Sequence, residues 1–355
     1  MNPKTRKRIA KAARHTVFYL IIVTIVVVVM TPVYFITALS FLSNYEAYKY
    51  PLPLVPSFQV RFKLEPGERG YLLSIWDRLE GAYVSVLDTG DVDKVRVYME
   101  THLGVKMSND EIARQIERLE ASPEGVVYFS RRRSLLSNYE TFFKVTRDAV
   151  PALIRSLEIA ALTIAISLSI GGTAGYAFAR YRFYGRNGLK FSVLFVRMFP
   201  GVAIAIPMVI ILANIGLYDQ PLGLSLIYSV GAIGMTVWIT ASIFLGIPPS
   251  YEEAAMVFGA TRPRAFLRIT LPLAFPGLAA AAMYAFLGAW NETVAAIILT
   301  QFHPTFSVVV YQTLLGATGQ VNLTAAGGIA MALPAVVFTF LIRRYINQMW
   351  GGITI

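Results

Sequence analysis

Long runs of apolar residues dominate the chain and predict helices that span a membrane. The first run, Val17–Leu42, contains no charged side chain. As a helix it would be about 39 Å long, which exceeds the hydrocarbon core of roughly 30 Å. Similar runs follow at Ile159–Ala179, Phe191–Ala213, Leu222–Gly246, Leu273–Thr300 and Ala325–Ile342. The pattern predicts an all-α polytopic membrane protein with six transmembrane helices.

The first apolar run has an alternative interpretation as a cleaved signal peptide, because basic residues precede it. These residues are Lys4, Arg6, Lys7, Arg8, Lys11 and Arg14. A signal peptide has a shorter apolar region that ends at a small-residue cleavage site. No such site follows cleanly here, so we expect a retained first span.

Basic residues in the short loops predict how the chain is oriented, because Lys and Arg favour the cytoplasmic side. Besides the N-terminal group, they are Arg180, Arg182, Arg186, Lys190, Arg262, Arg264, Arg268, Arg343 and Arg344. The opposite short loops, around Asp219 and His303, carry none. Both termini are therefore expected in the cytoplasm. The cluster Arg131–Arg133 does not contradict this orientation, since long loops cross the membrane largely regardless of charge.

A segment of domain size, residues 43–150, separates the first two spans. Its alternating residues predict short strands at Phe58–Phe62, Tyr71–Trp76, Ala82–Leu87 and Lys94–Met99. Ser108 or Asn109 is expected to cap a helix that ends near Leu119. We therefore predict an extracytoplasmic α+β insert. Its role is either that of a rigid spacer or that of a contact for an extracellular binding protein.

Composition supports a membrane protein. Of 355 residues, 55% are hydrophobic and 15% are charged, and the mean hydropathy of +0.55 excludes a soluble domain. A net charge of +11 is also typical of nucleic-acid-binding proteins. Here the basic residues cluster beside apolar runs, where they lie near anionic lipid, so no nucleic-acid partner is expected. The absence of cysteine excludes disulfides and thiol chemistry.

A short polar hairpin, residues 248–272, lies between the fourth and fifth apolar runs. Ser250 and Glu253 have the S-x-x-E spacing of a capping box, which predicts a helix that starts at Tyr251. Gly259 predicts the end of that helix.

A second hairpin helix is predicted from Thr261 as its cap and Pro263 in its first turn, before Pro272 leads into the fifth span. The small pair Ala254–Ala255 lets another surface approach closely. The hairpin is therefore either a docking element for a soluble partner or a loop that merely joins two spans.

The hairpin carries the pattern E-A-A-x-x-x-G-A-x-x-x-x-x-F-x-x-I-x-L-P. Its residues are Glu253, Ala254, Ala255, Gly259, Ala260, Phe266, Ile269, Leu271 and Pro272. This pattern is similar to the EAA loop of ABC importer permeases. The aspartate often found before the glycine of that loop is replaced here by Phe258.

Further segments extend the resemblance to the carbohydrate branch of these permeases, similar to the MalG-type subunit of maltose and trehalose importers. They are LSNYETFF (Leu136–Phe143), YAFARYRF (Tyr176–Phe183), RMFP (Arg197–Pro200), WNE (Trp290–Glu292) and GGIT (Gly351–Thr354). The resemblance covers the chain from Leu135 onward, and covers the first span only weakly. Residues 45–133 form a longer insert than that family usually has.

The resemblance implies a type I importer fold with three parts: residues 1–42, the insert 43–150, and a permease core 151–355 that contains the coupling loop 248–272. It implies a second homologous permease, a cytoplasmic ABC ATPase dimer, an extracellular solute-binding protein and a maltose- or trehalose-like sugar. The implied ATPase-coupling residues are Glu253, Ala254, Ala255, Gly259, Ala260, Arg262 and Phe266, and the tail near Gly352 and Thr354 would reach between the ATPase subunits.

Polar residues inside the apolar runs are candidates for the solute pathway, because ionisable groups at membrane depth usually face a cavity or a partner. Arg197 either faces the pathway or extends back to the cytoplasmic side. Trp290, Asn291 and Glu292 either line the pathway or seal an interface with the partner permease. The Gly171–Gly175 spacing permits close packing of helices.

The sequence contains neither a G-x-x-x-x-G-K-[ST] phosphate loop nor an H-E-x-x-H metal motif. We expect no catalytic residue, metal site or cofactor on this chain, with ATP and Mg²⁺ bound by the partner ATPase. The prediction is a non-enzymatic permease in contact with the lipid of the plasma membrane. The alternatives are a permease for a non-sugar solute and a membrane-anchored receptor that works through its insert. A channel or secondary transporter would need coupling-ion residues, and the spans are poor in Asp and Glu.

Overall fold

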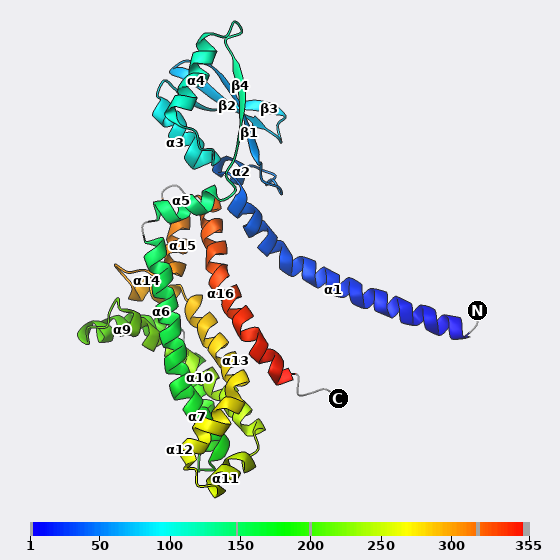
Figure 1. The fold of residues 1–355 in the computed structure, drawn as a ribbon, viewed down its shortest axis with the longest axis vertical. Helices are drawn as coiled ribbons and strands as arrows, with labels where there is room; N and C mark the ends of the chain where they lie inside the picture. The colour runs from blue at the N-terminus through cyan, green and yellow to red at the C-terminus, as the bar shows by residue number, and fades with distance from the viewer. Residues whose placement is uncertain (1–2, 147, 199–200, 317–319, 351–355) are drawn as a thin grey trace. The chain divides into compact units, whose positions relative to one another are not determined.

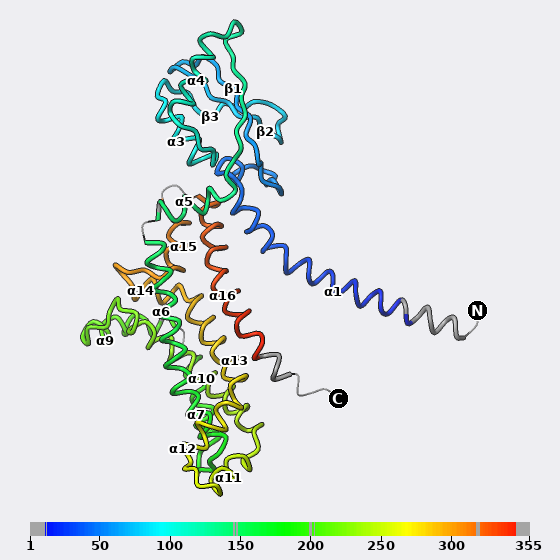
Figure 2. Tube along the Cα trace, in the orientation of Figure 1, coloured from blue at the N-terminus to red at the C-terminus, as the bar shows by residue number. Residues whose placement is uncertain are grey.

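The chain folds into two compact units, whose elements are labelled in Figure 1. This computed structural model describes residues 3–146, 148–198, 201–316 and 320–350. The first unit contains Met1–Val145 with Gly316–Ile329, and the second contains Thr146–Leu315 with Ala330–Ile355. Figure 2 follows the trace of each unit by residue number.

The first unit contains an antiparallel sheet with the strand order β3-β2-β1-β4. The strands are β1 (Gln59–Gly67), β2 (Gly70–Asp77), β3 (Ala82–Thr89) and β4 (Val127–Arg132). Phe62 pairs with Ile75, and Leu64 pairs with Leu73. These buried side chains pack against residues of two helices, including Met99. One face of the sheet and the two helices therefore enclose the core of this domain.

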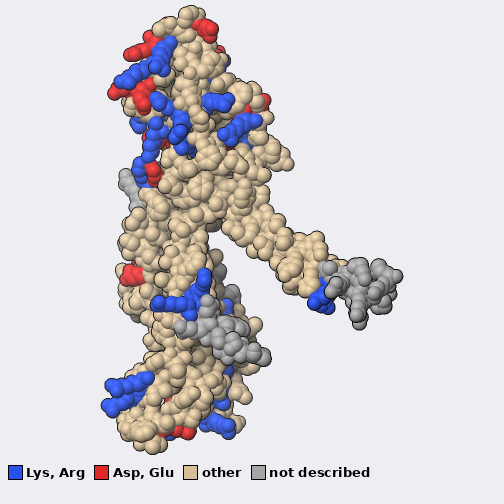
Figure 3. All heavy atoms as spheres, turned by 45° about the vertical axis from the view of Figure 1, so that its right-hand side comes forward, with Lys and Arg blue, Asp and Glu red and all other residues tan. Residues whose placement is uncertain are grey.

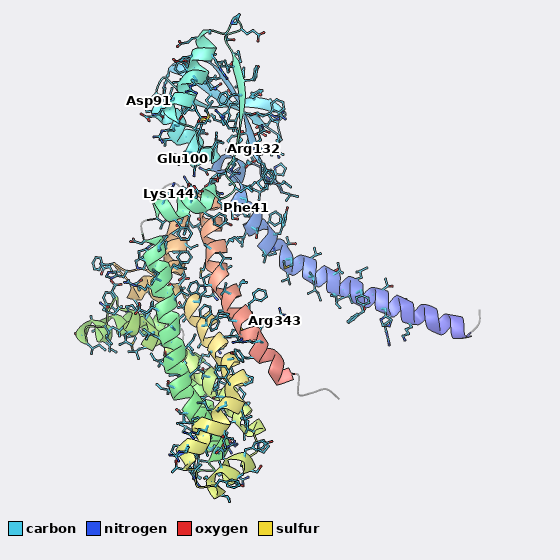
Figure 4. All side chains as sticks on the ribbon, viewed as in Figure 1. Phe41, Asp91, Glu100, Arg132, Lys144 and Arg343 are labelled. Atoms are coloured by element: carbon cyan, nitrogen blue, oxygen red, sulfur yellow. The ribbon has the colours of Figure 1, made fainter. Side chains whose placement is uncertain are left out.

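The first of these helices, α3 (Val92–Leu103), corrects the predicted strand at Lys94–Met99. Asp91 caps this helix by accepting a hydrogen bond of 2.9 Å from the amide of Asp93, and Figure 4 labels Asp91 at the start of α3. The buried residues Val95, Met99 and Leu103 recur every fourth position, which is the period of a helix face. The local alternation of apolar residues was therefore misleading, and the cap decided the structure.

The second of these helices, α4 (Asn109–Glu120), was predicted correctly. Ser108 accepts a hydrogen bond from the amide of Glu111 at 3.2 Å, and the Glu111 carboxylate accepts one from the amide of Ser108 at 3.1 Å. This reciprocal capping box satisfies two amides that the helix itself leaves without a partner. The first three predicted strands are also confirmed, whereas β4 was not predicted.

The remaining helices of the first unit are α1 (Pro3–Phe41), α2 (Asn44–Ala47), α5 (Ser137–Val145) and the start of α16 (Val321–Trp350). Two buried asparagines join α5 to the end of α1 and to α16. The Asn138 amide donates to the carbonyls of Ser40 and Leu42 at 2.8 and 2.7 Å. Asn322 donates to the side-chain oxygen of Asn138 at 3.1 Å. Since a buried amide is stabilised only when hydrogen-bonded, these contacts fasten α5 to α1 and α16.

The second unit is a helical bundle around α10 (Pro221–Gly246), against which α6, α7 and α13 pack. Besides the end of α16, its elements are α6 (Ala149–Ser167), the π-helical turn η1 (Leu168–Gly172), α7 (Thr173–Arg180), α8 (Arg186–Phe195), the 3₁₀ turn η2 (Val196–Met198), α9 (Gly201–Asn214), α13 (Leu271–Trp290), α14 (Val294–Leu299) and α15 (Phe306–Leu315). On the face shown in Figure 3, charged side chains are sparser along these helices than on the domain formed by the four-stranded sheet with α3 and α4.

Within the described residues, five helices are long and apolar enough to cross a membrane, and a bent pair of helices brings the number to six. The bent pair corrects the predicted third span, because Arg186–Met198 and Ala203–Asn214 differ in direction by 92°. The predicted fifth span, Leu273–Thr300, is also wrong in its second half. Its helix ends at Trp290, and the Glu292 carboxylate starts α14 by accepting a hydrogen bond of 2.9 Å from the amide of Ala295.

Glycines allow the second span to lie directly against α10, as the Gly171–Gly175 spacing predicted. A Cβ atom added to Gly171 would lie 2.8 Å from the Thr236 side chain, and one added to Gly175 would lie 2.9 Å from the backbone nitrogen of Ala241. Both distances are shorter than a carbon atom tolerates. Only glycine therefore permits this approach of the two backbones.

We expect Gly175→Ala to destabilise the purified chain by about 1–3 kcal/mol, because the added methyl group forces α7 away from α10. Thermal unfolding in detergent would measure this change. Gly328→Ala is the matched control, since a Cβ at that position in α16 meets no atom within 4 Å. Equal unfolding temperatures for the two variants would contradict the proposed contact.

Candidate functional site

The hairpin between α10 and α13 is the first candidate site, and Figure 1 shows it at one end of the second unit. It consists of α11 (Ser250–Val257), a turn at Gly259, α12 (Arg262–Ala265) and a π-helical turn, η3 (Phe266–Thr270). These elements place an exposed bend outside the apolar spans.

The start of α11 corrects the predicted capping box. The helix begins at Ser250 rather than Tyr251, and Pro249 is its N-cap, without a side-chain cap bond. Pro249 has φ −57° and ψ −26°, because its ring holds the backbone near helical geometry. Its carbonyl accepts hydrogen bonds from the amides of Glu252 and Glu253 at 3.0 and 3.1 Å. Ser250 is therefore already inside the helix, where its side chain does not cap.

The predicted end of α11 is confirmed. Gly259 has φ +86°, a conformation that residues with a side chain rarely adopt. The amide of Gly259 donates to the carbonyl of Met256, and the amide of Ala260 donates to that of Ala255, each at 3.0 Å. This pair of bonds is a Schellman motif. Thr261 then begins α12 as predicted, although its side chain makes no cap bond.

Pro272 leads into the following span, as predicted, and it does so without a break in the helix. The helical segment Arg262–Trp290 is continuous. In the π-helical turn, the amide of Leu271 donates to the carbonyl of Phe266, five residues earlier. Proline lacks an amide donor and crowds the carbonyl of the preceding turn, and the wider π-helical turn accommodates it. The hairpin is thus a direct extension of α13.

A buried carboxylate attaches α11 to the bundle, and the sequence analysis did not predict it. The side chain of Glu252 accepts hydrogen bonds from the Arg180 guanidinium at 2.8 Å, the Tyr176 hydroxyl at 2.7 Å and the Thr270 hydroxyl at 2.6 Å. These partners come from α7 and η3. Arg180 also donates to the carbonyl of Phe244 in α10 at 2.8 Å.

The electrostatics of this cluster favour the ionised form of Glu252. Burial alone would raise the pKa of its carboxyl group, but hydrogen bonds from Thr270, Tyr176 and Arg180 lower that pKa below its ordinary value. The signal in the sequence was the adjacent pair Glu252–Glu253. Neighbouring residues on a helix point about 100° apart, so only one of the two carboxylates could face the bundle.

The remaining hairpin residues of the prediction divide into exposed and packed groups. Glu253, Ala254, Gly259 and Arg262 are exposed, whereas Ala255 and Ala260 are half-buried. Phe266 lies inside, with its ring 4.5 Å from that of Tyr176, so it supports the hairpin from within. The predicted tail residues Gly352 and Thr354 lie outside the described residues.

The hairpin tip exposes two large apolar side chains that the sequence analysis did not select. Val257 is 84% exposed and Phe258 is 91% exposed. A shallow cleft of about 340 Å³ next to Phe258 is lined by Arg264 and Arg268. The tip therefore combines apolar and cationic groups, which is a composition typical of protein interfaces.

The predicted pathway residues do not all lie together. Trp290 is buried, donates a hydrogen bond to the carbonyl of Met331 at 2.9 Å and stacks on Phe286, so it belongs to the core. Asn291 is exposed. Arg197 and Glu292, in contrast, line one cleft of about 370 Å³.

The Arg197 guanidinium lies over the Tyr284 ring, 4.9 Å from its centroid. It is thus directed to α13, where a cation–π contact stabilises it. Across the described part of the chain, no group of three or more His, Asp or Glu side chains could hold a metal ion.

Known proteins match both the sequence and the fold. A family model described as the binding-protein-dependent transport system inner membrane component matches residues 147–350. The trehalose transport system permease protein SugB of Mycobacterium tuberculosis is 34% identical over 199 residues, or 55% of this chain and 73% of that protein. The trehalose/maltose transport system permease protein MalG of Thermococcus litoralis is 29% identical over 218 residues, or 60% of this chain and 78% of that protein.

A crystal structure of a bacterial ABC transporter involved in the import of the acidic polysaccharide alginate shares the fold. The TM-score is 0.57 at 16% sequence identity, with 95% of this chain and 98% of that chain covered. The type I ABC importer permease fold is thereby confirmed. Because the family model matches more than half of the residues, the chain belongs to the family of binding-protein-dependent transport system inner membrane components.

Proposed function

We propose that the chain is the permease subunit of an ATP-driven sugar importer, and that the hairpin 248–272 receives force from a separate ATPase. One observation carries this proposal: α11 is fastened to the bundle by the buried Glu252, while its tip presents uncovered apolar side chains. Relatives that transport trehalose, maltose or maltodextrin support a sugar as the solute.

The exposed tip is suited to a pocket on a soluble partner. Leaving Val257 and Phe258 in water is unfavourable. Burying them in a partner would stabilise the complex by about 25 cal/mol of binding free energy for each Å² of apolar surface removed from water. Arg262 and Arg264 beside them are exposed and would face acidic groups of the partner. Phe258 replaces the aspartate common in this loop, so the contact at the turn is apolar here.

The hairpin is suited to transmit movement because it joins the bundle at two points. α12 continues through η3 into α13 without a break, and Glu252 ties α11 to α7. A displacement of the tip therefore moves α13 and α7 together. Closure of the ATPase dimer would in this way bias the pore between outward and inward access, since the two states differ in their contacts with the ATPase.

The complete importer would contain a second homologous permease, two ATPase copies and an extracellular solute-binding protein. ATP and Mg²⁺ would bind the ATPase, with no cofactor or catalytic residue on this chain. The hairpin and both termini would lie in the cytoplasm, which the basic residues near them favour. The tail near Gly352 and Thr354 would reach between the ATPase subunits.

Reconstitution tests the proposal. We expect proteoliposomes that contain the full complex to take up trehalose or maltose only with ATP and the binding protein. Uptake by this chain without the ATPase would instead indicate a channel or secondary transporter. Uptake of a non-sugar solute without uptake of any sugar would favour a permease for a non-sugar solute. A complex that binds its solute but does not take it up would favour a membrane-anchored receptor.

Glu253→Lys should lower sugar-stimulated ATP hydrolysis at least several-fold. Glu253 is exposed on α11, so charge reversal disturbs the docking contact and leaves the fold intact. ATP hydrolysis by the reconstituted complex, together with the unfolding temperature, measures both effects. Glu124→Lys, an exposed position in the insert, is the matched control, and an unchanged rate for Glu253→Lys would count against the assigned contact.

Glu252→Gln should lower the free energy of unfolding of the chain by about 3–5 kcal/mol at neutral pH, because it leaves Arg180 buried without its carboxylate. The pKa of Glu252 is lowered in the folded chain. The stabilisation is therefore complete above the ordinary pKa of a glutamate and is lost as pH falls through the lower folded value.

Unfolding measured between neutral and acidic pH should thus show the difference between Glu252→Gln and the unmodified chain shrinking in acid. The double variant Glu252→Gln, Arg180→Gln should lose less stability than the sum of its single variants. Additive losses would mean that the two side chains do not interact.

A further inference from the structure

A cleft in the second unit contains polar groups with few partners in the described chain, although its walls come from the apolar segments of the bundle. Its volume is about 370 Å³, within the range of small-molecule sites. The residues that matter to its chemistry are Arg197, Met208, Tyr228, Tyr284 and Glu292. They come from η2, α9, α10, α13 and the break after Trp290.

Three of these side chains have few polar contacts within the described chain, and they differ in burial: the Tyr228 hydroxyl is buried, Glu292 is half-buried and Arg197 is exposed. The Tyr228 hydroxyl is buried and has no hydrogen-bond partner among the described residues. The Arg197 guanidinium has an aromatic ring as its neighbour and no carboxylate within the described chain. The Glu292 carboxylate accepts one hydrogen bond, from the amide of Ala295, and is not ion-paired to any described residue.

A buried hydroxyl without a hydrogen bond is unfavourable, which applies to Tyr228. Arg197 and Glu292 add one cationic and one anionic group to the same cleft. The cleft is therefore suited to a polar occupant. The chemistry of the groups decides which occupant fits.

The cleft offers donors and acceptors in balance. Arg197 only donates, ionised Glu292 only accepts, and the Tyr228 hydroxyl can do both. An anionic solute would meet Glu292 and a cationic one would meet Arg197. An apolar solute would leave all three groups without partners. A neutral solute with many hydroxyl groups satisfies each of them, and Met208 and the Tyr284 ring can contact its C–H surface.

We propose that this cleft is a solute-contact site for neutral, polyhydroxylated molecules of the sugar class, and that the Tyr228 hydroxyl determines which hydroxyl pattern is accepted. This inference rests on the proposed function as a sugar permease. It assigns to this subunit a direct part in selecting the solute, beyond its part in coupling. Specificity follows because a site built to hydrogen-bond a hydroxyl group rejects an analogue that lacks it.

The test is uptake by the complete reconstituted importer, with trehalose, maltose and their monodeoxy analogues as probes. The unmodified importer should prefer each parent sugar over at least one monodeoxy analogue. Tyr228→Phe should reduce that preference about tenfold, the usual range for one buried hydrogen bond, because the group that recognises the missing hydroxyl is gone. Tyr311→Phe, on α15 and outside this cleft, should keep the preference.

A second measurement separates solute contact from a contact with the partner permease. If the Tyr228 hydroxyl is free before the solute arrives, Tyr228→Phe should not lower the unfolding temperature of the sugar-free complex. A lower unfolding temperature, with equal loss of uptake for every sugar, would overturn the proposal in favour of an interface role. An unchanged preference for the parent sugars would also overturn it.

The outcomes for the site and for the proposed function remain distinguishable. If the unmodified importer carries neither trehalose nor maltose nor any analogue, the sugar assignment fails and this inference fails with it. If it carries a sugar and Tyr228→Phe selects among analogues as before, only the inference about the cleft fails.

Discussion

The ion pair between Glu252 and Arg180 is the constraint on which the working geometry of the second unit depends. Together with the hydrogen bonds from Tyr176 and Thr270 to Glu252, it attaches α11 to the bundle. With it, α7, α10, α11 and η3 meet around one carboxylate, because Arg180 also binds the carbonyl of Phe244. The aromatic ring of Tyr176 packs against Phe244 and Phe266 around the same group. A charged cluster thus joins the helices at the hairpin end of a bundle that is otherwise apolar.

The hairpin and the cleft differ in how they use polar groups. At the hairpin, both carboxylate oxygens of Glu252 have donors, namely Tyr176, Arg180 and Thr270, although the Arg180 Nη2 atom has no partner among the described residues. In the cleft, Arg197, Tyr228 and Glu292 are left incomplete by the described chain. Polar groups that satisfy one another hold a structure together, whereas polar groups left open point to a ligand or a partner. The same residue types therefore mark two different roles.

Much of the fold could be predicted from the sequence, because local signals agree with the final structure. The Ser108 capping box predicts the start of α4, and Gly259 predicts the end of α11. The apolar runs predict the helices α1, α10 and α16. Local patterns failed where a nearby cap or proline changed the outcome, as at Lys94–Met99 and Ser250. The partners of Glu252 could not be predicted, since Tyr176 and Thr270 are distant in the chain. The packing of Trp290 likewise depends on α16, which no local pattern reveals.

The glycine contact of α7 with α10 limits how the protein can change shape. Two backbones in such close contact cannot slide past one another, since any shift would drive Thr236 or Ala241 into the opposite helix. The hairpin end of the bundle is therefore stiffened where α7 meets α10. The helix α13 ends at Trp290, and Glu292 in the short non-helical segment that follows lines the cleft. A movement of the stiffened end relative to this segment would change the width of the cleft.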